Sequence, residues 1–412
     1  MIAGLRCAVC GASVDIATPL AWRCPNASAA DPHHVLHLIG ASTGGPVRQV
    51  AAPERTGEGN PFVRYGPRLA WWAFARANGM TDAACEALTW EVAGDFRVTP
   101  FQRSTWLSDT LELDIWVNDE TGNVAGSHKA RHLASILLHL RAAESLGLLD
   151  TRRRLAIASC GNAALAAGHL AAAADWPIDV YVPDWVSDTT EAGLRDLGAL
   201  VHRCPRRADD PPGDPAMLRC REAVAGGAIP FTVQGPENAY CLDGGRTIGW
   251  EIADQAADHH VTLDRIVVQV GGGALAACVG AGLGHGVRLD TVQAEGCAPL
   301  AETWDRITDI DHPERYWSQV MRPWTEPHSL ADGILDDETY DWIADIEAMV
   351  ESGGRPVVAP EADIVRAHEL ATAAGFDASP TGSAGLAGVL AARADIHDHH
   401  RVAIIMSGVS RP

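Results

Sequence analysis

The sequence predicts an α/β fold with parallel sheets, and three features of its pattern lead to that prediction. From about residue 155 onward, short apolar segments alternate with helical ones. The apolar segments are continuous and do not alternate with polar residues, which is typical of strands covered on both faces. Two of them end in glycine-containing turns, at 159–162 and 271–273, from which a helix begins at once.

Apolar periodicity, β-branched runs and turn residues place the expected elements along the chain. We expect strands at 114–118, 155–159, 178–183, 199–202, 265–270, 291–294 and 402–406. We expect helices at 71–78, 82–90, 163–174, 191–197, 216–225, 244–257, 362–374 and 382–393. One more helix should run through Leu138 and Ala143, with Ser127 as its cap. Residues 44–60 and 205–215 are rich in turn residues and are expected to be loops.

The bulk composition is that of a globular protein, with 47% hydrophobic and 21% charged residues among 412. This length is sufficient for two or three domains. A formal charge of −21 repels phosphate backbones and anionic lipids, so neither nucleic acid nor a membrane surface is an expected partner. There is no apolar run of membrane-spanning length and no signal-peptide pattern at the start. Ten thinly spread cysteines then predict reduced thiols in a cytoplasm.

Lys129 is the only lysine among the 32 lysines and arginines of the chain. Arginine supplies positive charge everywhere else, so the one lysine is expected to do something that a guanidinium cannot. A lysine amine can lose its proton in a suitable pocket and attack a carbonyl to form a Schiff base, whereas arginine stays protonated. The alternative is a leftover surface lysine, and the flanking residues and a glycine-rich loop argue against it.

A predicted strand leads into Gly271, Gly272 and Gly273, and a helix begins with Ala274 and Leu275. Glycines let backbone N–H groups close around an anion, and the helix N-terminus adds favourable partial charge, so the junction predicts a phosphate cradle. The spacings of the dinucleotide fingerprint and of the P-loop are absent. Alone, such a turn is often only a tight connection. Combined with a single lysine, it indicates a phosphorylated aldehyde cofactor.

Two further strand ends carry polar side chains. Ser159, Cys160, Gly161 and Asn162 form a second strand-to-helix junction, whose N–H groups could hold a substrate carboxylate. The Asn162 amide could donate to a phenolic oxygen; otherwise Ser159 or Asn162 is only a helix cap. Near the C-terminus, Ser407 follows a buried strand, where its hydroxyl can bond a pyridine nitrogen.

The N-terminal cysteines Cys7, Cys10 and Cys24 resemble the start of a zinc ribbon, in which two knuckles carry thiolates. A complete ribbon has a fourth cysteine three positions beyond Cys24, where this chain has Ala27. The missing ligand could come from one of three nearby residues: Asp31, His33 or His34. A ribbon-shaped module without metal is the alternative interpretation.

Taken in order, these motifs resemble those of the fold-type II pyridoxal-phosphate enzymes, which include threonine synthase, serine/threonine dehydratase, cysteine synthase and the tryptophan synthase β chain. The resemblance runs from about residue 99 to the C-terminus. Shorter matches lie at 119–120, 245–251, 293–299 and 331–334. The cysteine-bearing N-terminus is most similar to threonine synthase, the segment 126–129 to tryptophan synthase β, and residues 331–333 to the dehydratases.

The resemblance implies that pyridoxal 5'-phosphate is the cofactor and that Lys129 holds it as a Schiff base and serves as the general base. The implied cofactor contacts are His128, Asn162, Gly271, Gly272, Gly273, Ala274, Leu275 and Ser407. The implied substrate contacts are Ser159, Cys160, Gly161 and Asn162. The implied architecture is a homodimer whose chain has a zinc-ribbon-like module at 1–45, a large cofactor-binding domain at 46–150 and 230–412, and a small α/β domain at 151–229.

The expected reaction is elimination or replacement on an amino acid with a β-hydroxyl or an activated β leaving group. The alternative is threonine synthase-like β,γ-replacement on a phosphorylated homoserine-type substrate. Two departures from threonine synthases weigh against that alternative: His128 stands where they have Phe, and Ala163 where they have Thr. A non-catalytic binding protein of this fold and a nucleotide-dependent enzyme are interpretations from other classes, and the single lysine argues against both. Substrate selectivity should depend on loops such as 316–328 and 336–342.

Overall fold

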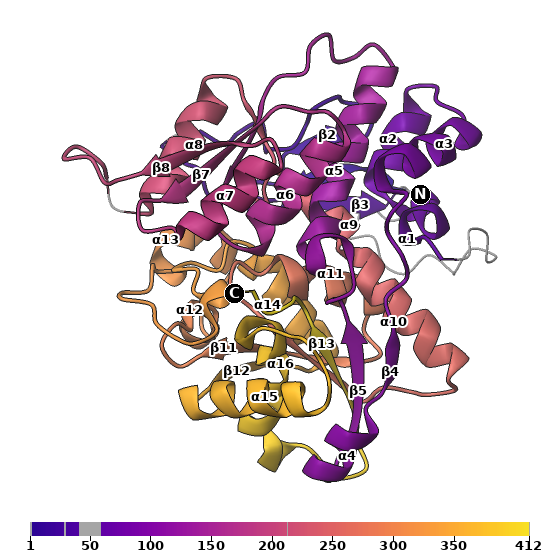
Figure 1. The fold of residues 1–412 in the computed structure, drawn as a ribbon, viewed down its shortest axis with the longest axis vertical. Helices are drawn as coiled ribbons and strands as arrows, with labels where there is room; N and C mark the ends of the chain where they lie inside the picture. Colours follow the sequence, from indigo (N-terminus) through magenta and orange to yellow (C-terminus); the bar gives the residue numbers. More distant parts are fainter. Residues whose placement is uncertain (1, 29, 41–58, 212, 412) are drawn as a thin grey trace.

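The computed structural model describes residues 2–28, 30–40, 59–211 and 213–411, and in these residues the strands form three sheets (Figure 1). The largest has the strand order β12-β11-β10-β13-β5-β4 and is parallel except for β4, which pairs antiparallel with β5. Its strands are β4 (Phe101–Arg103), β5 (Asp114–Asp119), β10 (Arg265–Gln269), β11 (Arg288–Ala294), β12 (Pro356–Ala359) and β13 (Arg401–Met406).

The strand β10 explains why this sheet is covered on both faces. Ile266 and Val268 belong to an apolar cluster with α10, α11 and α14, whereas Val267 belongs to another cluster with α15 and α16. Adjacent residues of a strand point to opposite faces, so a continuous apolar run needs a layer on each side. The covering helices are α10 (Arg246–Asp258), α11 (Ala274–Leu283), α14 (Trp342–Ser352), α15 (Glu361–Ala373) and α16 (Pro380–Ala391).

A second, fully parallel sheet has the order β8-β7-β6-β9 and lies in the upper part of Figure 1 with α6, α7 and α8 around it. Its strands are β6 (Leu155–Ala158), β7 (Ile178–Pro183), β8 (Leu200–Cys204) and β9 (Ile229–Pro230). The helices are α6 (Asn162–Ala173), α7 (Asp188–Asp196) and α8 (Pro215–Ala225). Ser187 and Asp214 cap α7 and α8 through their side-chain oxygens.

The third sheet is small and antiparallel, with the order β2-β1-β3. Its strands are β1 (Ile2–Cys7), β2 (Ser13–Asp15) and β3 (Leu36–Gly40). The remaining helices are α1 (Pro61–Arg64), α2 (Ala70–Ala77), α3 (Asp82–Ala93), α4 (Thr105–Leu111), α5 (Lys129–Ser145), α9 (Cys241–Gly244), α12 (Pro299–Arg306) and α13 (Trp317–Val320). No helix of the described residues has the length and apolar character needed to cross a lipid bilayer.

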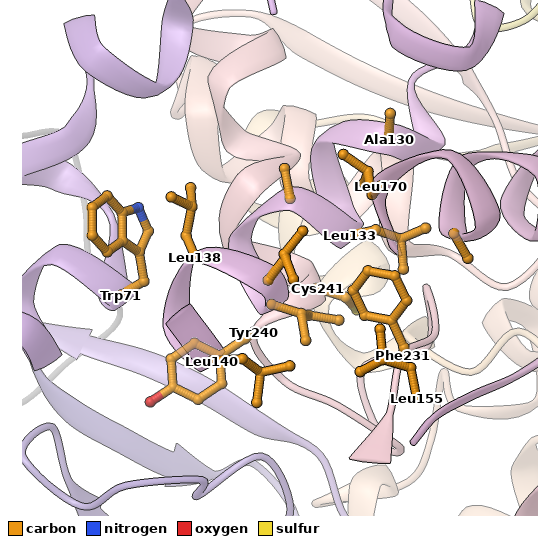
Figure 2. Packing of buried hydrophobic residues seen from close by; sticks show 14 of the residues in the cluster. Trp71, Ala130, Leu133, Leu138, Leu140, Leu155, Leu170, Phe231, Tyr240 and Cys241 are labelled. Atoms are coloured by element: carbon orange, nitrogen blue, oxygen red, sulfur yellow. The ribbon is translucent and has the colours of Figure 1, made fainter. Parts of the chain in front are cut away.

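Helix α5 lies at the centre of the largest apolar cluster. Leu133 and Leu140 of this helix pack in one cluster with Trp71, Phe231 and Tyr240, which come from distant parts of the chain (Figure 2). A helix surrounded in this way is fixed in position by side-chain packing on several sides. The first residue of α5 is therefore held on a rigid element.

The predicted strands and helices are confirmed within a few residues, but the predicted cap of α5 is wrong. The helix begins at Lys129 with His128 in the cap position, and within the described part of the chain no side-chain cap bond is formed. Ser127 is extended and forms a β-bridge with Gly408, and its buried Oγ has no hydrogen-bond partner among the described residues. Pairing with the C-terminal segment has taken Ser127 out of the capping geometry. Of the expected loop at 44–60, residues up to 58 lie outside the described residues.

The division of the chain into domains stays a prediction. The four-stranded sheet takes its strands from residues 155–230, and the three-stranded sheet from residues 2–40. The six-stranded sheet combines β4 and β5 with strands that begin only at Arg265. The chain thus leaves the six-stranded sheet after β5, builds the four-stranded sheet, and then returns.

Candidate active site

Lys129 stands at the start of α5, in a segment that is joined to the C-terminal strand. The His128 amide donates to the Ser407 carbonyl (3.0 Å), and the Val409 amide donates to the Gly126 carbonyl (2.9 Å). These bonds hold the turn after β13 against the residues that precede α5. The structure therefore brings Lys129 and Ser407 together although 278 residues separate them in the sequence.

The Ser407 hydroxyl is oriented by Gln269, the last residue of β10. Gln269 Nε2 donates to Ser407 Oγ (2.8 Å), and it also donates to the carbonyls of Gly382 (2.9 Å) and Ile405 (3.1 Å). Because Ser407 Oγ accepts this bond, its own hydrogen is left for another acceptor. Ser407 is 4% exposed, so an acceptor that approaches it must come from within the site.

Asn162 is oriented by Arg411. Arg411 Nε donates to Asn162 Oδ1 (2.7 Å), and Arg411 Nη2 donates to the Ala125 carbonyl (2.6 Å). With its oxygen engaged, Asn162 turns its Nδ2 toward Gly408. A Cβ atom added to Gly408 would lie 2.8 Å from this nitrogen. The two amide hydrogens of Asn162 are thus presented beside the turn that contains Ser407.

The glycine turn at the start of α11 has the form of an anion cradle. Gly273 occupies the cap position with φ +99°, a conformation that L side chains rarely adopt, and no side chain caps the helix. The cap residue therefore offers no acceptor to the Ala274 and Leu275 amides, whereas Asp336 bonds the Gly272 amide and Asp345 the Ala277 amide. Uncapped amides and the helix dipole favour an anion at this position.

Three carboxylic acids pack against this turn, and the sequence did not predict them. A Cβ on Gly271 would come within 2.6 Å of Asp336 Oδ2, and one on Gly273 within 2.5 Å of Asp345 Oδ2. The Asp341 amide donates to the Gly272 carbonyl (2.8 Å). Burial raises the pKa of Asp336 to about 6 and that of Asp341 to about 7, in each case against the effect of Lys129. Burial also raises the pKa of Asp345 well above its usual range.

These acids connect the cradle with the lysine. Burial lowers the pKa of the Lys129 amine, while Asp336 and Asp341 partly oppose the shift. The same two acids contact the glycine turn, so the lysine amine and the cradle share them as electrostatic neighbours. An amine with a lowered pKa is neutral in a larger fraction of molecules, and the neutral form is the nucleophile.

His128, the residue before the lysine, is held by a hydrogen bond to His132, which is held in turn by a backbone carbonyl. The Cys241 carbonyl can only accept, so His132 donates to it from Nδ1 (2.9 Å). His132 Nε2 must then accept from His128 Nδ1 (3.2 Å). Burial lowers the pKa of His132 to about 3 and that of His128 well below its usual range, so both rings are neutral. His128 Nε2 carries a lone pair and no proton to offer a phosphate, which favours a role in shaping the pocket.

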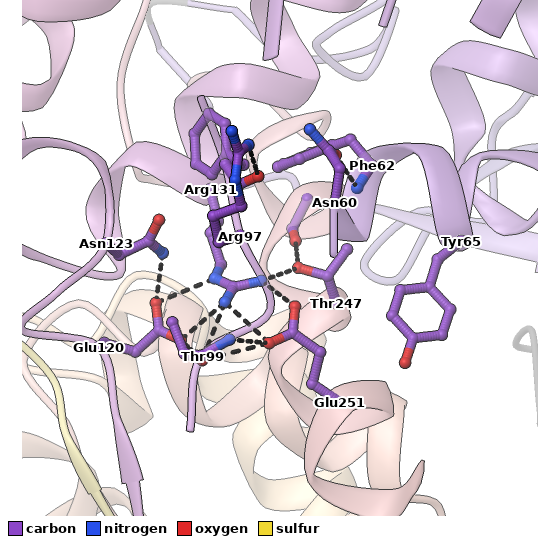
Figure 3. Close-up of polar contacts among 12 residues, drawn as sticks. Asn60, Phe62, Tyr65, Arg97, Thr99, Glu120, Asn123, Arg131, Thr247 and Glu251 are labelled. Carbon is purple, nitrogen blue, oxygen red and sulfur yellow. Dashed lines mark hydrogen bonds and ion pairs between the residues drawn. The ribbon is translucent and has the colours of Figure 1, made fainter. Parts of the chain in front are cut away.

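Just beyond the lysine, Arg131 joins two shorter motifs in one buried network (Figure 3). Its guanidinium donates twice to Glu120, from Nε and Nη2 (both 2.9 Å), and it pairs with Glu251. Arg131 also donates to Thr99 Oγ1 (3.0 Å) and Thr247 Oγ1 (2.9 Å). The three charged side chains are fully buried. Although burial lowers the pKa of Arg131, the two glutamates raise it above its ordinary value. This network fixes the first turn of α5.

The predicted substrate loop precedes α6. Gly161 occupies the cap position of that helix with no side-chain cap, and Asn162 is the first helical residue, so neither Ser159 nor Asn162 serves as its cap. The Gly161 amide donates to Ser159 Oγ (3.3 Å). Burial raises the pKa of the Cys160 thiol, and negative charge on Asp332 and Asp214 adds to the shift. The loop thus offers uncapped helix amides in acidic surroundings.

The arrangement fits pyridoxal 5'-phosphate. The cradle offers amides to a phosphate, Lys129 offers a nucleophilic amine to an aldehyde, and Ser407 offers a hydroxyl hydrogen to a pyridine nitrogen. Asn162 offers amide hydrogens to a phenolic oxygen beside the same turn. The donor set therefore matches each polar group of the cofactor.

The three N-terminal cysteines named by the sequence lie close to one another. Cys7, Cys10 and Cys24 form one group with His34, and their ligand atoms all lie within 4.8 Å of one another. This group belongs to the module built on β1 and β3, and none of the four residues contributes to the cradle or contacts Lys129. The candidate active site and the cysteine group are therefore two separate sites.

Comparisons with known proteins show which family and which fold the chain resembles. The family model described as pyridoxal-phosphate dependent enzyme matches residues 92–408. The threonine synthase of Methanosarcina acetivorans is 26% identical over 306 residues, which cover 71% of this chain and 68% of that protein. Two solved structures with the same fold are a T.th. threonine deaminase and the maize serine racemase. The first has a TM-score of 0.64 at 21% identity and covers 80% of this chain and 97% of its own. The second has a TM-score of 0.62 at 17% identity and covers 80% of this chain and 93% of its own.

The matched family segment spans most of the chain and contains Lys129, the glycine cradle and Ser407. Members of this family use pyridoxal 5'-phosphate. The α/β architecture with parallel sheets is that of the similar solved structures. The protein therefore belongs to the family of pyridoxal-phosphate dependent enzymes.

Proposed function

We propose that the protein catalyses elimination or replacement at the β-carbon of an amino acid that carries a hydroxyl or an activated leaving group there. One observation carries the proposal: Lys129, whose amine has a lowered pKa, directly follows His128, whose amide is bonded to the Ser407 carbonyl, and the neutral Ser407 hydroxyl is already held by Gln269. Ser407 would give the pyridine nitrogen of a bound cofactor a neutral hydrogen-bond partner, and a cofactor held in this way would supply chemistry suited to expulsion of a β substituent. Relatives named threonine deaminase and serine ammonia-lyase are in line with this chemistry.

Pyridoxal 5'-phosphate bound in this site supplies the electron sink. The residues that would hold it are Lys129, Asn162, Gly271, Gly272, Gly273, Ala274, Leu275 and Ser407, while His128 would shape the pocket. Lys129 Nζ takes the proton from the substrate α-carbon as general base. The amides of the loop 159–162 hold the substrate carboxylate at the start of α6. The protein thus supplies position, a base and fixed dipoles, and the substrate supplies the leaving group.

Threonine synthase-like replacement on a phosphorylated homoserine-type substrate is the second candidate, and the 26% identity to a threonine synthase favours it. The charge around the substrate loop favours the first candidate. Asp214 and Asp332 both act on Cys160, and Asp336 and Asp337 act on each other nearby. Both candidate substrates carry a carboxylate, but only the second adds a phosphate dianion, which the carboxylates of Asp214 and Asp332 would repel.

A substrate screen separates the two candidates. Purified enzyme is incubated with serine, threonine, their phospho- and acetyl-esters and homoserine phosphate, while release of keto acid and of phosphate is followed. Keto acid from hydroxyl or acetyl-ester substrates supports elimination or replacement at the β-carbon. Phosphate released from homoserine phosphate alone, with no keto acid from any hydroxy amino acid, overturns the proposal in favour of the second candidate.

Three properties of the whole protein belong to the same proposal: it is a homodimer, it acts in the cytoplasm, and its partner is a small amino acid. The fold-type II resemblance supports the first and the reduced cysteines support the second. Sedimentation equilibrium of the full chain gives the mass in solution. A monomer at micromolar concentration contradicts the dimer.

Gly273→Ala is expected to weaken cofactor binding by about tenfold or more. Alanine at φ +99° costs about 1–3 kcal/mol of backbone strain, and its Cβ would come within 2.5 Å of Asp345 Oδ2. The cradle amides then move away from the phosphate. The dissociation constant is measured by titrating the apoenzyme with pyridoxal phosphate and following tryptophan fluorescence. Gly286→Ala is the matched control, because a Cβ at Gly286 meets nothing within 4 Å. Equal affinity in both variants contradicts the cradle.

Covalent capture of pyridoxal phosphate by the apoenzyme is expected to rise with pH and to level off at a lower pH than for a free lysine. The reacting form is the neutral amine, and burial lowers the pKa of Lys129, so the proton is lost earlier. The rate is followed by stopped-flow absorption at about 410–430 nm, with α-N-acetyl-lysine as reference. A midpoint at or above that of the reference contradicts a buried, activated amine.

A further inference from the structure

The N-terminal module gathers four potential metal ligands from three separate turns. Cys7 and Cys10 flank the turn after β1, Cys24 lies in the following loop, and His34 precedes β3. Cys10 Sγ is 3.6 Å from Cys24 Sγ, and Cys7 Sγ is 3.3 Å from His34 Nδ1. In a tetrahedral zinc site with zinc–sulfur bonds of about 2.3 Å, two sulfurs lie about 3.8 Å apart. The observed separations are those of atoms around a common centre.

The surroundings of these ligands also suit a metal. Asp31 Oδ2 lies 3.1 Å from His34 Nε2 and accepts its proton, which leaves the Nδ1 lone pair facing Cys7. A carboxylate behind a ligating histidine is the usual outer partner in zinc sites. The Cys7 sulfur accepts from the Cys10 amide (3.5 Å), and the Cys10 sulfur accepts from Asn26 Nδ2 (3.3 Å). Such N–H donors stabilise thiolates.

The ligand set is closed. Cys7, Cys24 and His34 are buried, and Cys10 is the exposed member of the group. Four protein ligands fill a tetrahedral shell and leave no position for water or substrate, which is typical of a structural zinc site. We propose that Cys7, Cys10, Cys24 and His34 bind one zinc ion, with Asp31 orienting His34, and that this ion fixes the N-terminal module to the catalytic part of the chain.

The contacts of the module show what the ion holds in place. Cys24 packs in one apolar cluster with Leu36 and Ala239. The Ala239 amide donates to the Trp22 carbonyl (2.9 Å), two residues before Cys24. The Leu20 amide donates to His139 Nε2 (3.2 Å) on α5, the helix that begins with Lys129. The loop between the cysteines therefore rests on α5 and on the segment leading to α9.

Metal analysis of the full-length enzyme, purified without chelators, tests the proposal. We expect one zinc per chain in the wild type, and less than about a tenth of that in Cys24→Ser and in His34→Ala. Cys85→Ser is the matched control, because Cys85 is also buried but lies in α3; it should keep its zinc. Asp31→Asn should keep the ion but release it to a competing chelator about 10–100-fold more readily. Cobalt substitution of the wild type should give the visible bands of a tetrahedral thiolate site.

Three results would overturn the proposed zinc site. One is that the wild-type enzyme contains no zinc and takes up none when zinc is added. A chain lighter by two hydrogens, with Cys10 and Cys24 joined in a disulfide, is another. A third is loss of zinc in His33→Ala while His34→Ala retains it. The wild-type measurements decide the matter even if the Cys24 variant fails to fold, and none of these readouts depends on catalytic activity or on bound pyridoxal phosphate.

Discussion

Replacing Lys129 with arginine is expected to lower turnover by at least about 10²–10⁴-fold, the usual contribution of a positioned general base. Arginine keeps the positive charge and much of the length of lysine, but it cannot lose its proton at the pH of the assay. Both functions proposed for Lys129, capture of the aldehyde and removal of the substrate α-proton, are lost together. Steady-state assays on the substrate identified by the screen give the loss.

A second variant distinguishes catalysis from packing. Lys129→Ala removes the amine and leaves space for a small primary amine such as methylamine, which should restore part of the activity in a concentration-dependent manner. Lys129→Arg fills that space and should not respond. Activity within tenfold of wild type in Lys129→Arg would contradict the assignment, as would an equal response of both variants to methylamine.

Replacing Arg131 with glutamine is expected to reduce the free energy of unfolding by about 3–5 kcal/mol. The change leaves Glu120 and Glu251 buried without their cation, and an uncompensated buried charge carries a cost of this size. Since Arg131 is two residues from Lys129, loosening of this network should also disorder the first turn of α5. Guanidinium denaturation followed by tryptophan fluorescence measures the loss.

Arg195→Gln is the control for that experiment. Its guanidinium pairs with Glu191 on the exposed face of α7, a type of pair worth about 0–1 kcal/mol. Arg131→Lys keeps the charge but cannot donate to both glutamates in the same way, so its loss should fall between those of the other two variants. If Arg131→Gln is as stable as Arg195→Gln, the network does not anchor the helix.

Much of the fold follows from local sequence. The apolar run of β10 and the glycine turn after it could be predicted directly, because burial on both faces and a sharp turn leave local signatures. The strand β12 (Pro356–Ala359) leaves none: it is four residues long, begins with proline and exposes Val358 at the sheet edge. The three-residue β4 is shorter still and pairs antiparallel. Edge strands this short resemble loops.

Some residues of the candidate site could be predicted from the sequence and others could not. Lys129 stood out because lysine occurs once, and Ser407 because a polar residue ends a buried strand. Asp336, Asp341 and Asp345 were missed because more than 200 residues separate them from the lysine; the first two lie in the expected loop 336–342, and no element was predicted at Asp345. A signal was present for Asp345, which lies between Ile343 and Ile346 among the buried positions of α14. A charged residue on the buried face of a helix usually has a partner or a role.

The buried network around Arg131 could not be predicted from local sequence patterns either. Glu120 and Glu251 were noticed only as short family-like matches, and nothing in their spacing shows that one arginine binds both. Such long-range pairing is decided by how the six-stranded sheet brings β5 beside α10 and α5. Residue type can suggest that a buried charge needs a partner, but only the fold identifies the partner.

The most direct test of the proposed site is to locate the covalent link to the cofactor. Enzyme loaded with pyridoxal phosphate is reduced with borohydride, digested and analysed by mass spectrometry. Because Lys129 is the only lysine, the sole competing amine is that of the N-terminus. We expect a pyridoxyl adduct on the peptide that contains Lys129 and loss of the absorption band at about 410–430 nm. An unmodified Lys129 peptide, or an adduct confined to the N-terminal amine, would contradict the assignment of Lys129.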